Sequence, residues 1–371
     1  MSSFITHVIA GEEALSRALP DSAFVLQSAG DPRPFFRLGC QGPDIFYHNQ
    51  RTKPSGLHYG ALAHRHGYGA LIAGAFAALP AADRRPDRPG GAYLLGLATH
   101  AAVDRATHPF IVCFSGWADP SRPETEIYRG CHPFLERLLD LAYLKVARGQ
   151  SGAEYDVEAL LDQDASRSPP EDGDLIPLWA GGLRRAYPRS AGGDFLIEKR
   201  IANALADARY FYGITNPAVT ALNSAREDWF AYLDDRAGAR TVALVYPDDL
   251  PLDLDLMNES RAEWPHPAGD GRVSRSTYVE LVTAGIGKAT ENLRVLLDAM
   301  AAGKSGKGSM EQVEASIEIA VGNGSLSVCD PDGSPAAPRA CRPLPLRLVM
   351  EAEYRKRLEW AKHLLVRARR D

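Results

Sequence analysis

Histidine and acidic residues gather in the first part of the chain, a combination that binds divalent metal ions. Eight of the ten histidines lie in the segment 1–132, and carboxylate side chains alternate with them. Histidine nitrogens and carboxylate oxygens are common protein ligands of zinc and similar metals. The members of this group are His7, Asp44, His48, His58, His64, His66, His100, Asp104, His108, His132 and Glu136. Their clustering predicts a metal site.

The strongest pattern in this group is His100-x-x-x-Asp104-x-x-x-His108. Steps of four residues place the three side chains on one face of a helix. Eight residues of helix rise about 12 Å, so we expect the two histidines to bind different ions, with Asp104 able to bridge them. His132-x-x-x-Glu136 repeats the four-residue step at the start of the next expected helix. Two such helices packed together would bring both pairs into one cleft.

The other nearby histidines and aromatic residues could surround a substrate. His64 and His66 are two positions apart and face different directions on a helix, so we expect them not to share an ion. A single histidine or aromatic residue is more often part of the core or the surface. The candidates for a substrate pocket are Phe46, Tyr47, His48, Tyr59 and His64.

Apolar residues recur at helical spacing through most of the segment 1–235, where strand-like alternation is nearly absent. The segments with this spacing are 57–79, 92–107, 132–148, 195–212 and 217–233. The run that contains His100 is expected to end at Pro109, because proline lacks an amide donor. Another helix is expected over 277–302, where Thr277 and Glu280 form a capping-box pattern and Gly303 could end it. The sequence therefore predicts a mainly α-helical protein.

Proline and glycine punctuate the chain between these segments. Connecting loops are expected at 83–91, 166–173 and 264–271, and a flexible linker at 303–309. Over 313–329, β-branched residues alternate around Gly322-Asn323-Gly324, which predicts a small β-hairpin. Loops of this kind often shape a pocket.

The last segment, 346–370, is amphipathic and rich in Lys and Arg, which predicts a helix. We expect one face of it to pack back on the bundle, and peripheral contact with an anionic membrane is the alternative. The predicted organisation is a helical domain over 1–303 with the candidate metal ligands within 1–140, a linker and hairpin region over 304–345, and a C-terminal helix over 346–371.

The overall composition is that of a folded protein with a substantial core. Hydrophobic residues make up 45% and charged residues 24% of the 371 residues. The formal net charge of -5 argues against broad nucleic-acid binding. Five widely spaced cysteines without a C-x-x-C pair argue against a disulfide framework and a thiolate zinc site. With no leader pattern and no long apolar run, we expect a cytoplasmic protein that does not span a membrane.

In order and spacing, these residues resemble the zinc-dependent phospholipases C, a family related to the P1-type nucleases. The resemblance covers most of the segment 1–140 and implies a helical bundle like that of the phospholipase C and P1 nuclease superfamily. It rests on Thr6-His7, Gly42-Pro43-Asp44, His58 fourteen residues later, His100-x-x-x-Asp104, His108-Pro109 and His132-x-x-x-Glu136.

The resemblance also implies which residues bind zinc. One ion would be held by His58, His100 and Asp104, and a second by His108, His132 and Glu136. In processed, secreted members a third ion is held by residues matching Asp104 and His7 together with the N-terminal amine and carbonyl. The chain departs from the family here, because we expect no cleavable leader and see no tryptophan that would stand at a mature start. Two zinc ions are therefore expected, and a third stays open.

The implied activity is hydrolysis of a small phosphate ester or phospholipid head group. Metal-activated water would attack phosphorus, with Asp44 as general base. The structural alternative for Asp44 is a turn residue after Gly-Pro. The functional alternatives are a P1-like single-strand nuclease or 3'-nucleotidase, and a repurposed metalloprotein or biosynthetic hydrolase on the same fold.

Overall fold

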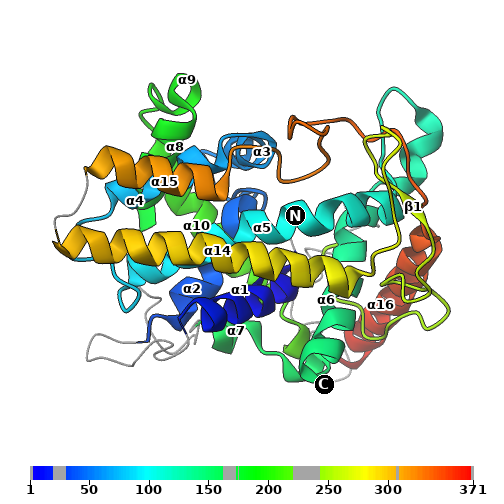
Figure 1. Ribbon diagram of the computed structural model, residues 1–371. Helices are drawn as coiled ribbons and strands as arrows, with labels where there is room; N and C mark the ends of the chain where they lie inside the picture. Colours follow the sequence, from blue (N-terminus) through cyan, green and yellow to red (C-terminus); the bar gives the residue numbers. More distant parts are fainter. Residues whose placement is uncertain are drawn as a thin grey trace.

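The computed structural model describes residues 3–19, 31–161, 173, 175–219, 243–305 and 309–368, and this part of the chain is mainly α-helical (Figure 1). The mainly α class predicted from the sequence is confirmed. The α-helices are α1 (Phe4–Ala18), α2 (Arg33–Gly39), α3 (Leu57–Arg65), α4 (Tyr68–Ala78), α5 (Pro89–Ser115), α6 (Cys131–Arg148), α7 (Val157–Leu160), α8 (Leu175–Ala186), α9 (Pro188–Ala191), α10 (Ile197–Ile214), α14 (Tyr278–Ser305), α15 (Met310–Val321) and α16 (Leu346–Ala368). The 3-10 helices are η1 (Gly42–Phe46), η2 (Pro123–Tyr128), η3 (Gly152–Glu154) and η5 (Pro217–Val219).

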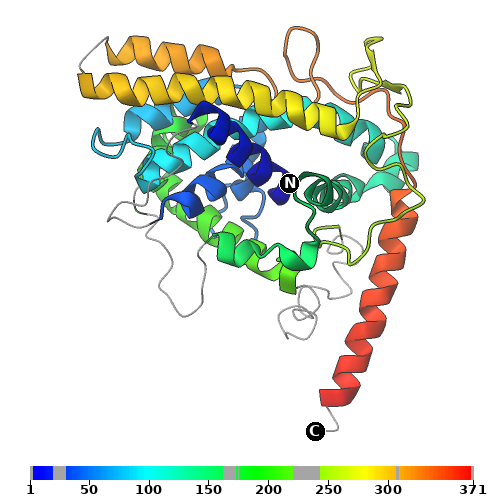
Figure 2. The same ribbon diagram turned by 60° about the horizontal axis from the view of Figure 1, so that its bottom comes forward.

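Helix α5 is the centre of the bundle and is buried along nearly its whole length. It packs against α1, α2, α6 and α14, and α14 runs beside it in both ribbon views (Figures 1 and 2). A helix that is apolar on most sides is expected to be enclosed in this way. The approach of α2 is close, since a Cβ on Gly96 would lie 2.1 Å from the carbonyl oxygen of Phe36. The glycine therefore permits this packing.

Helix α5 is longer than predicted. It begins at Pro89, passes through Pro109 and ends at Ser115, where Gly116 has a φ of +71°. A proline inside a helix removes one backbone hydrogen bond. Here the turns after Pro109 are held by packing, because Phe110 and Phe114 contact each other and both contact Trp264. The prediction that the helix ends at Pro109 is therefore wrong.

The segment predicted as one helix over 57–79 is two helices, α3 and α4. The break lies at Gly67, whose φ of +78° is in the left-handed region that glycine tolerates best. The first amides of α4 are bonded from outside the helix, since Gly67 donates to the carbonyl of Asn323 and Gly69 to that of Gly322. The end of α15 thus satisfies backbone donors at the start of α4.

The β-hairpin predicted over 313–329 is wrong, because most of this segment belongs to helix α15. Ser309 and Gln312 form a capping box at its start, and buried Ile317 and Val321 lie four residues apart on its inner face. These helical signals outweigh the β-branched alternation. The described strands are β1 (Trp264–Pro265) and β2 (Val273–Ser274), an antiparallel pair within and just after the predicted loop 264–271.

The helices predicted over 132–148, 195–212 and 277–302 correspond closely to α6, α10 and α14. Of the helix predicted over 217–233, only η5 lies within the described residues, and most of the predicted loop 166–173 and part of the linker 303–309 lie outside them. Helix α16 is present as predicted. Its first turns pack on α6, with Leu346 and Met350 buried, and its far end extends away from the bundle (Figure 2).

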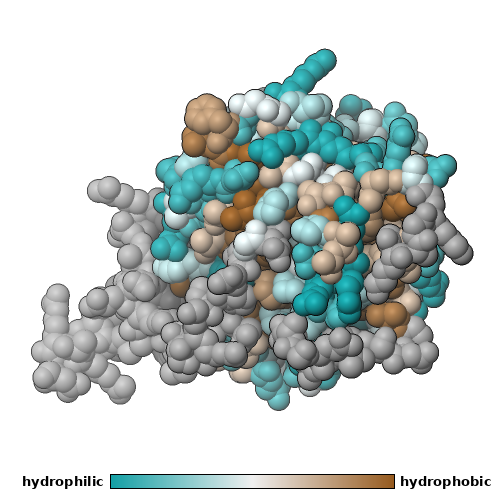
Figure 3. Space-filling model, turned by 90° about the vertical axis from the view of Figure 1, so that its left-hand side faces the viewer, coloured by the Kyte–Doolittle hydropathy of each residue, from teal (hydrophilic) through white to brown (hydrophobic). Residues whose placement is uncertain are grey.

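The outer surface combines polar and apolar residues. On the face shown in Figure 3, hydrophilic side chains surround small apolar areas in the described part of the chain. This mixture is ordinary for a protein surface in contact with water. Among the described helices, none has the length and apolar composition needed to cross a membrane.

We expect Thr277→Ala to lower the free energy of unfolding by about 1 kcal/mol, the usual effect of losing an N-cap side chain. The Thr277 hydroxyl accepts from the amide of Glu280, and the Glu280 carboxylate accepts from the amide of Thr277. Chemical denaturation measures the effect. Thr283→Ala on the exposed side of α14 is the matched control and should change stability by less than about 0.5 kcal/mol. Equal effects in both variants would contradict a specific role for the cap.

Candidate metal centre

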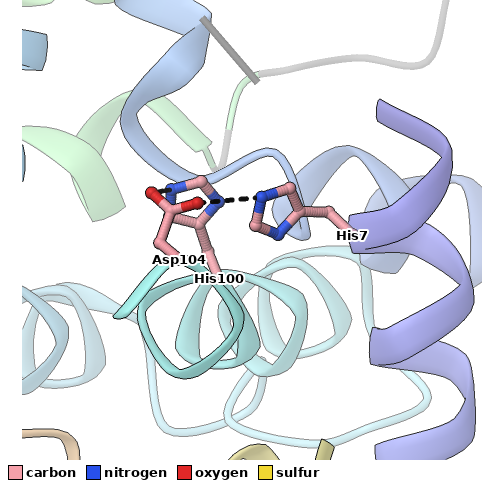
Figure 4. A group of neighbouring side chains, drawn as sticks. All are labelled: His7, His100 and Asp104. Carbon is pink, nitrogen blue, oxygen red and sulfur yellow. Dashed lines mark ion pairs between the residues drawn. The ribbon is translucent and has the colours of Figure 1, made fainter. Parts of the chain in front are cut away.

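The carboxylate of Asp104 lies at the centre of a buried group of histidines. Asp104 Oδ2 is 3.0 Å from His100 Nε2, and Asp104 Oδ1 is 3.2 Å from His108 Nδ1, so the residues one turn away on either side of α5 both contact it. His7 on α1 approaches from a neighbouring helix, with Nε2 3.0 Å from Asp104 Oδ1 (Figure 4). Asp104 is 1% exposed. A single carboxylate therefore contacts three imidazole rings in the protein interior.

The ligand-type atoms form three neighbouring groups, and within each group they lie within 4.8 Å of one another. The groups are His7, His100 and Asp104; Asp44, His64 and His100; and His108, His132 and Glu136. Each could hold a metal ion. The third is the ligand set predicted for the second ion. The first unites His7 and Asp104, the side chains expected at the open third ion, whereas the N-terminal amine lies outside the described residues.

His58, the predicted ligand beside His100, does not join these groups. Its side chain is exposed and its ring lies against Tyr59. His64 takes the expected place, with Nε2 3.2 Å from Asp44 Oδ1 and 3.6 Å from Asp104 Oδ2. Both histidines belong to α3, but six residues at about 100° each turn one side chain about 120° from the other. Only one of them can therefore face α5.

Backbone carbonyls orient two of the histidine rings. His64 Nδ1 lies 2.8 Å from the carbonyl oxygen of Gly60, and His100 Nδ1 lies 3.2 Å from that of Cys40. A carbonyl can only accept, so Nδ1 donates in each ring and Nε2 is the nitrogen that faces the carboxylates. This is the usual arrangement of a metal-binding histidine, whose second nitrogen is held by a backbone or carboxylate oxygen.

Glycine is required where η1 passes over His100. Gly42 has a φ of +55°, and a Cβ at this position would lie 2.3 Å from Cγ of the His100 ring. Any side chain would therefore displace the imidazole. The Gly-Pro-Asp turn thus combines a close approach to α5 with the placement of Asp44, which is 1% exposed and 3.9 Å from His100 Nε2.

The group on α5 and α6 has a more open position. His132 Nε2 is 3.3 Å and His108 Nε2 is 3.8 Å from Glu136 Oε1. Glu136 is 2% exposed, whereas the His132 side chain is 20% exposed. The rings of His108 and His132 stack at a centroid distance of 5.4 Å. This group therefore lies at the boundary between the core and the cavity.

The electrostatics of the centre favour bound cations. Burial alone would raise the pKa of Asp104, but the charges of His100 and His108 hold that pKa well below its usual range. Burial alone would lower the pKa of His108, but Asp104 raises it to about 9. Buried carboxylates that stay ionised need compensating positive charge. The site is thus arranged to attract it.

Several buried polar atoms of the centre have no hydrogen-bond partner but are ligand types that a metal ion accepts. His100 Nε2 and Asp104 Oδ2 are 3.0 Å apart, yet neither has a hydrogen-bond partner among the described residues. Glu136 Oε2 is likewise buried without a hydrogen bond. Such atoms normally find a partner. Close nitrogen and oxygen atoms without hydrogen-bond geometry are consistent with atoms that share a cation.

A cavity of about 760 Å³ lies over the centre, and His64, His108 and His132 are part of its wall. Two further parts of the chain line it, and sequence analysis predicted neither as part of a pocket: Trp117 after the end of α5, and residues 325–338, which we call the wall segment. The pattern within the segment 1–140 carries no signal for the wall segment, which lies far later in the chain.

The wall segment is bound directly to the helices of the metal centre. Arg105, the residue after Asp104, donates to the carbonyl of Ser325 at 3.3 Å. Its other nitrogens donate to carbonyls of the residues just before the wall segment, Val321, Gly322 and Gly324. The amide of Leu326 donates to the carbonyl of His64 at 2.9 Å. One attachment therefore starts beside a candidate ligand on α5, and the other starts at a candidate ligand on α3.

Of the aromatic and histidine residues predicted around the pocket, Tyr47 and His64 line the cavity. The other three lie in the core and are not among its lining residues. Phe46 packs against Trp179, Tyr59 is fully buried, and His48 stacks on Phe211. Their position near Asp44 in the sequence is therefore misleading, because Phe46 faces α8, His48 faces α10, and the Tyr59 hydroxyl donates to Asp194.

His64→Ala should remove metal from the centre, whereas His58→Ala should not, because only His64 faces the carboxylates. The two variants change the same residue type on the same helix, so they form a matched pair. Metal content per chain after dialysis, measured by plasma mass spectrometry, should fall in His64→Ala and match wild type in His58→Ala. The reverse result would restore His58 as a ligand.

Comparisons of this chain with protein-family models, with curated proteins and with solved structures gave no match.

Proposed function

We propose that the chain is a zinc-dependent hydrolase of phosphate esters with phospholipase C-like chemistry. The observation that carries the proposal is the shared position of Asp104, around which three groups of metal-type ligands meet beneath a cavity. Several adjacent divalent ions are typical of enzymes that cleave phosphate esters. A structural zinc site, by contrast, is usually a single closed set of four ligands.

The ligand chemistry supports zinc. All three groups combine imidazole nitrogens with carboxylate oxygens, a donor set that suits zinc better than magnesium or calcium. Three divalent ions would bring six positive charges, and Asp44, Asp104 and Glu136 would return three negative ones. When bound, the ions supply positive charge for a phosphate oxyanion and lower the pKa of water.

The chain's own residues would orient the reaction. Asp44 is the candidate general base, since its carboxylate lies beside His64 and His100 at the base of the centre. A base must stand within hydrogen-bond reach of the water whose proton it accepts. Asp44 also belongs to the group with His64 and His100 that could hold an ion. Its role as a base and a role as a metal ligand therefore require separate measurements.

The cavity favours an ester that has an apolar portion. Leu57, Trp117 and Val328 contribute apolar surface, and the wall segment adds prolines and alanines. Among the described residues that line the cavity, Arg65 is the sole Lys or Arg. A groove for a polynucleotide would need several cations along the backbone path. These walls support a phospholipid-like ester over the nuclease alternative.

Asp104→Asn and Asp44→Asn should both reduce hydrolysis of a phosphate ester, for different reasons. Loss of the shared carboxylate at Asp104 should release zinc and thereby abolish hydrolysis. If Asp44 is the base, its amide variant should keep the zinc and lose about 10²- to 10⁴-fold in kcat. Steady-state kinetics and metal analysis on the same samples separate the two.

The control for this pair is Asp194→Asn, because Asp194 contacts Tyr59 and Arg200 and lies outside the three groups. It should keep zinc and activity. Loss of zinc in Asp44→Asn would make Asp44 a ligand. Full activity of chelator-treated, metal-free protein would refute the hydrolase proposal, and tightly held zinc without turnover of any phosphate ester would favour a repurposed metalloprotein.

A butyl phosphodiester should be hydrolysed with a kcat/KM about tenfold or more above that of the methyl analogue. Each buried methylene group adds about 0.8 kcal/mol, and about 1.4 kcal/mol gives a factor of ten. Trp117→Ala should reduce this ratio by removing apolar wall. A dinucleotide offered in the same assay tests the alternative, and its preferential cleavage would favour the nuclease.

A further inference from the structure

The helix that carries His7 has no cap of its own at its N-terminus. Ser3 occupies the N-cap position of α1, but its side chain makes no capping hydrogen bond. The first amides of a helix lack partners within the helix and need acceptors from elsewhere. In α1 the acceptor comes from α6, because the Asp140 carboxylate accepts from the amides of Ile5 at 3.0 Å and Thr6 at 2.7 Å.

This contact lies directly beside a candidate metal ligand. His7 follows Thr6 in the chain, and its Nε2 contacts Asp104 at 3.0 Å. A carboxylate at a helix N-terminus is also favoured by the partial positive charge of the helix dipole. Asp140 therefore fixes the end of α1 at the turn where His7 must point into the metal centre.

Asp140 is itself held firmly. Its side chain is fully buried, and the Tyr246 hydroxyl donates to Asp140 Oδ2 at 2.7 Å. Arg137 supplies a buried positive charge 4.0 Å from the same oxygen and donates to the Tyr246 hydroxyl at 2.9 Å. A buried carboxylate with this many partners is a rigid reference point rather than a mobile surface charge.

The spacing on α6 links this anchor to the metal ligands. His132, Glu136 and Asp140 follow one another in steps of four, so they lie along one face of the helix. The first two belong to the group with His108, and the third bonds to the backbone of α1. One helix face thus supplies two candidate ligands directly and places a third, His7, through Asp140.

We propose that Asp140 is a positioning residue for His7 and thereby determines whether the group of His7, His100 and Asp104 binds its ion. This inference rests on the proposed metal centre. Partners that orient a ligand without touching the metal typically change metal affinity by about 10- to 100-fold. Asp140 acts through the backbone of α1, so its loss should affect this group and leave the group of His108, His132 and Glu136 intact.

The test is a zinc titration of metal-free protein, followed by calorimetry, for wild type, His7→Ala, Asp140→Asn and the double variant. Asp140→Asn should weaken one ion by about 10- to 100-fold and leave the remaining ions unchanged. Adding Asp140→Asn to His7→Ala should cause no further loss, because both changes act on the same ion. Such non-additivity is the signature of a shared pathway.

Two further variants separate positioning from general destabilisation. Asp207→Asn is the matched control, since the buried Asp207 carboxylate also accepts from two backbone amides, those of Arg51 and Thr52, outside the three groups. It should lower stability without changing zinc binding. Tyr246→Phe removes a single hydrogen bond to Asp140 and should weaken the same ion by a smaller factor, so the proposal stays testable if Asp140→Asn fails to fold.

Wild-type zinc binding in both Asp140→Asn and Tyr246→Phe would overturn the inference while leaving the metal centre in place. Equal loss of all ions in Asp140→Asn, or a matching loss in Asp207→Asn, would show a general structural effect and overturn it as well. A wild-type chain that binds no zinc would refute the proposed function, and the inference with it.

Discussion

The shared contact of the Asp104 carboxylate with four buried histidines is the interaction on which the rest of the structure depends. A charge placed this deep is unfavourable unless positive groups surround it. The surrounding groups come from α1, α3 and α5, so satisfying one carboxylate brings separate helices to one point. The proposed ions would complete this balance, and for that reason the protein should be most stable in its metal-loaded form.

The packing around α5 follows from the same requirement. A helix that presents chemistry on one face must be enclosed on its others, and α2 and η1 reach it closely at Gly96 and Gly42. The next residue on α5 after Asp104 also has a structural role. Arg105 donates to the carbonyl of Ser325 and to three carbonyls just before the wall segment. A candidate metal ligand and an attachment of the wall segment are thus positioned by adjacent residues of one helix.

Local spacing predicted the parts of the site that local geometry determines. The steps of four on α5 and α6 correctly placed His108, His132 and Glu136 together, because one helix turn decides which side chains are neighbours. The choice between His58 and His64 depends on which face of α3 meets α5, a tertiary fact that spacing cannot supply. The wall segment was not predicted for a related reason, since its attachments to Arg105 and His64 join residues far apart in the sequence. The hairpin prediction failed because β-branched residues also fit a helix that has a good cap and a surface to pack on.

The wall segment lies far from the candidate metal ligands in the sequence, although Arg105 and the His64 carbonyl attach it to them in the fold. The candidate ligands lie between His7 and Glu136, whereas the wall segment on one side of the cavity comes from 325–338. During synthesis the candidate metal ligands therefore leave the ribosome well before the wall segment, together with earlier lining residues such as Tyr47 and Trp117. Insertion or exchange in the wall segment would therefore reshape one side of the cavity without any alteration of the candidate metal ligands.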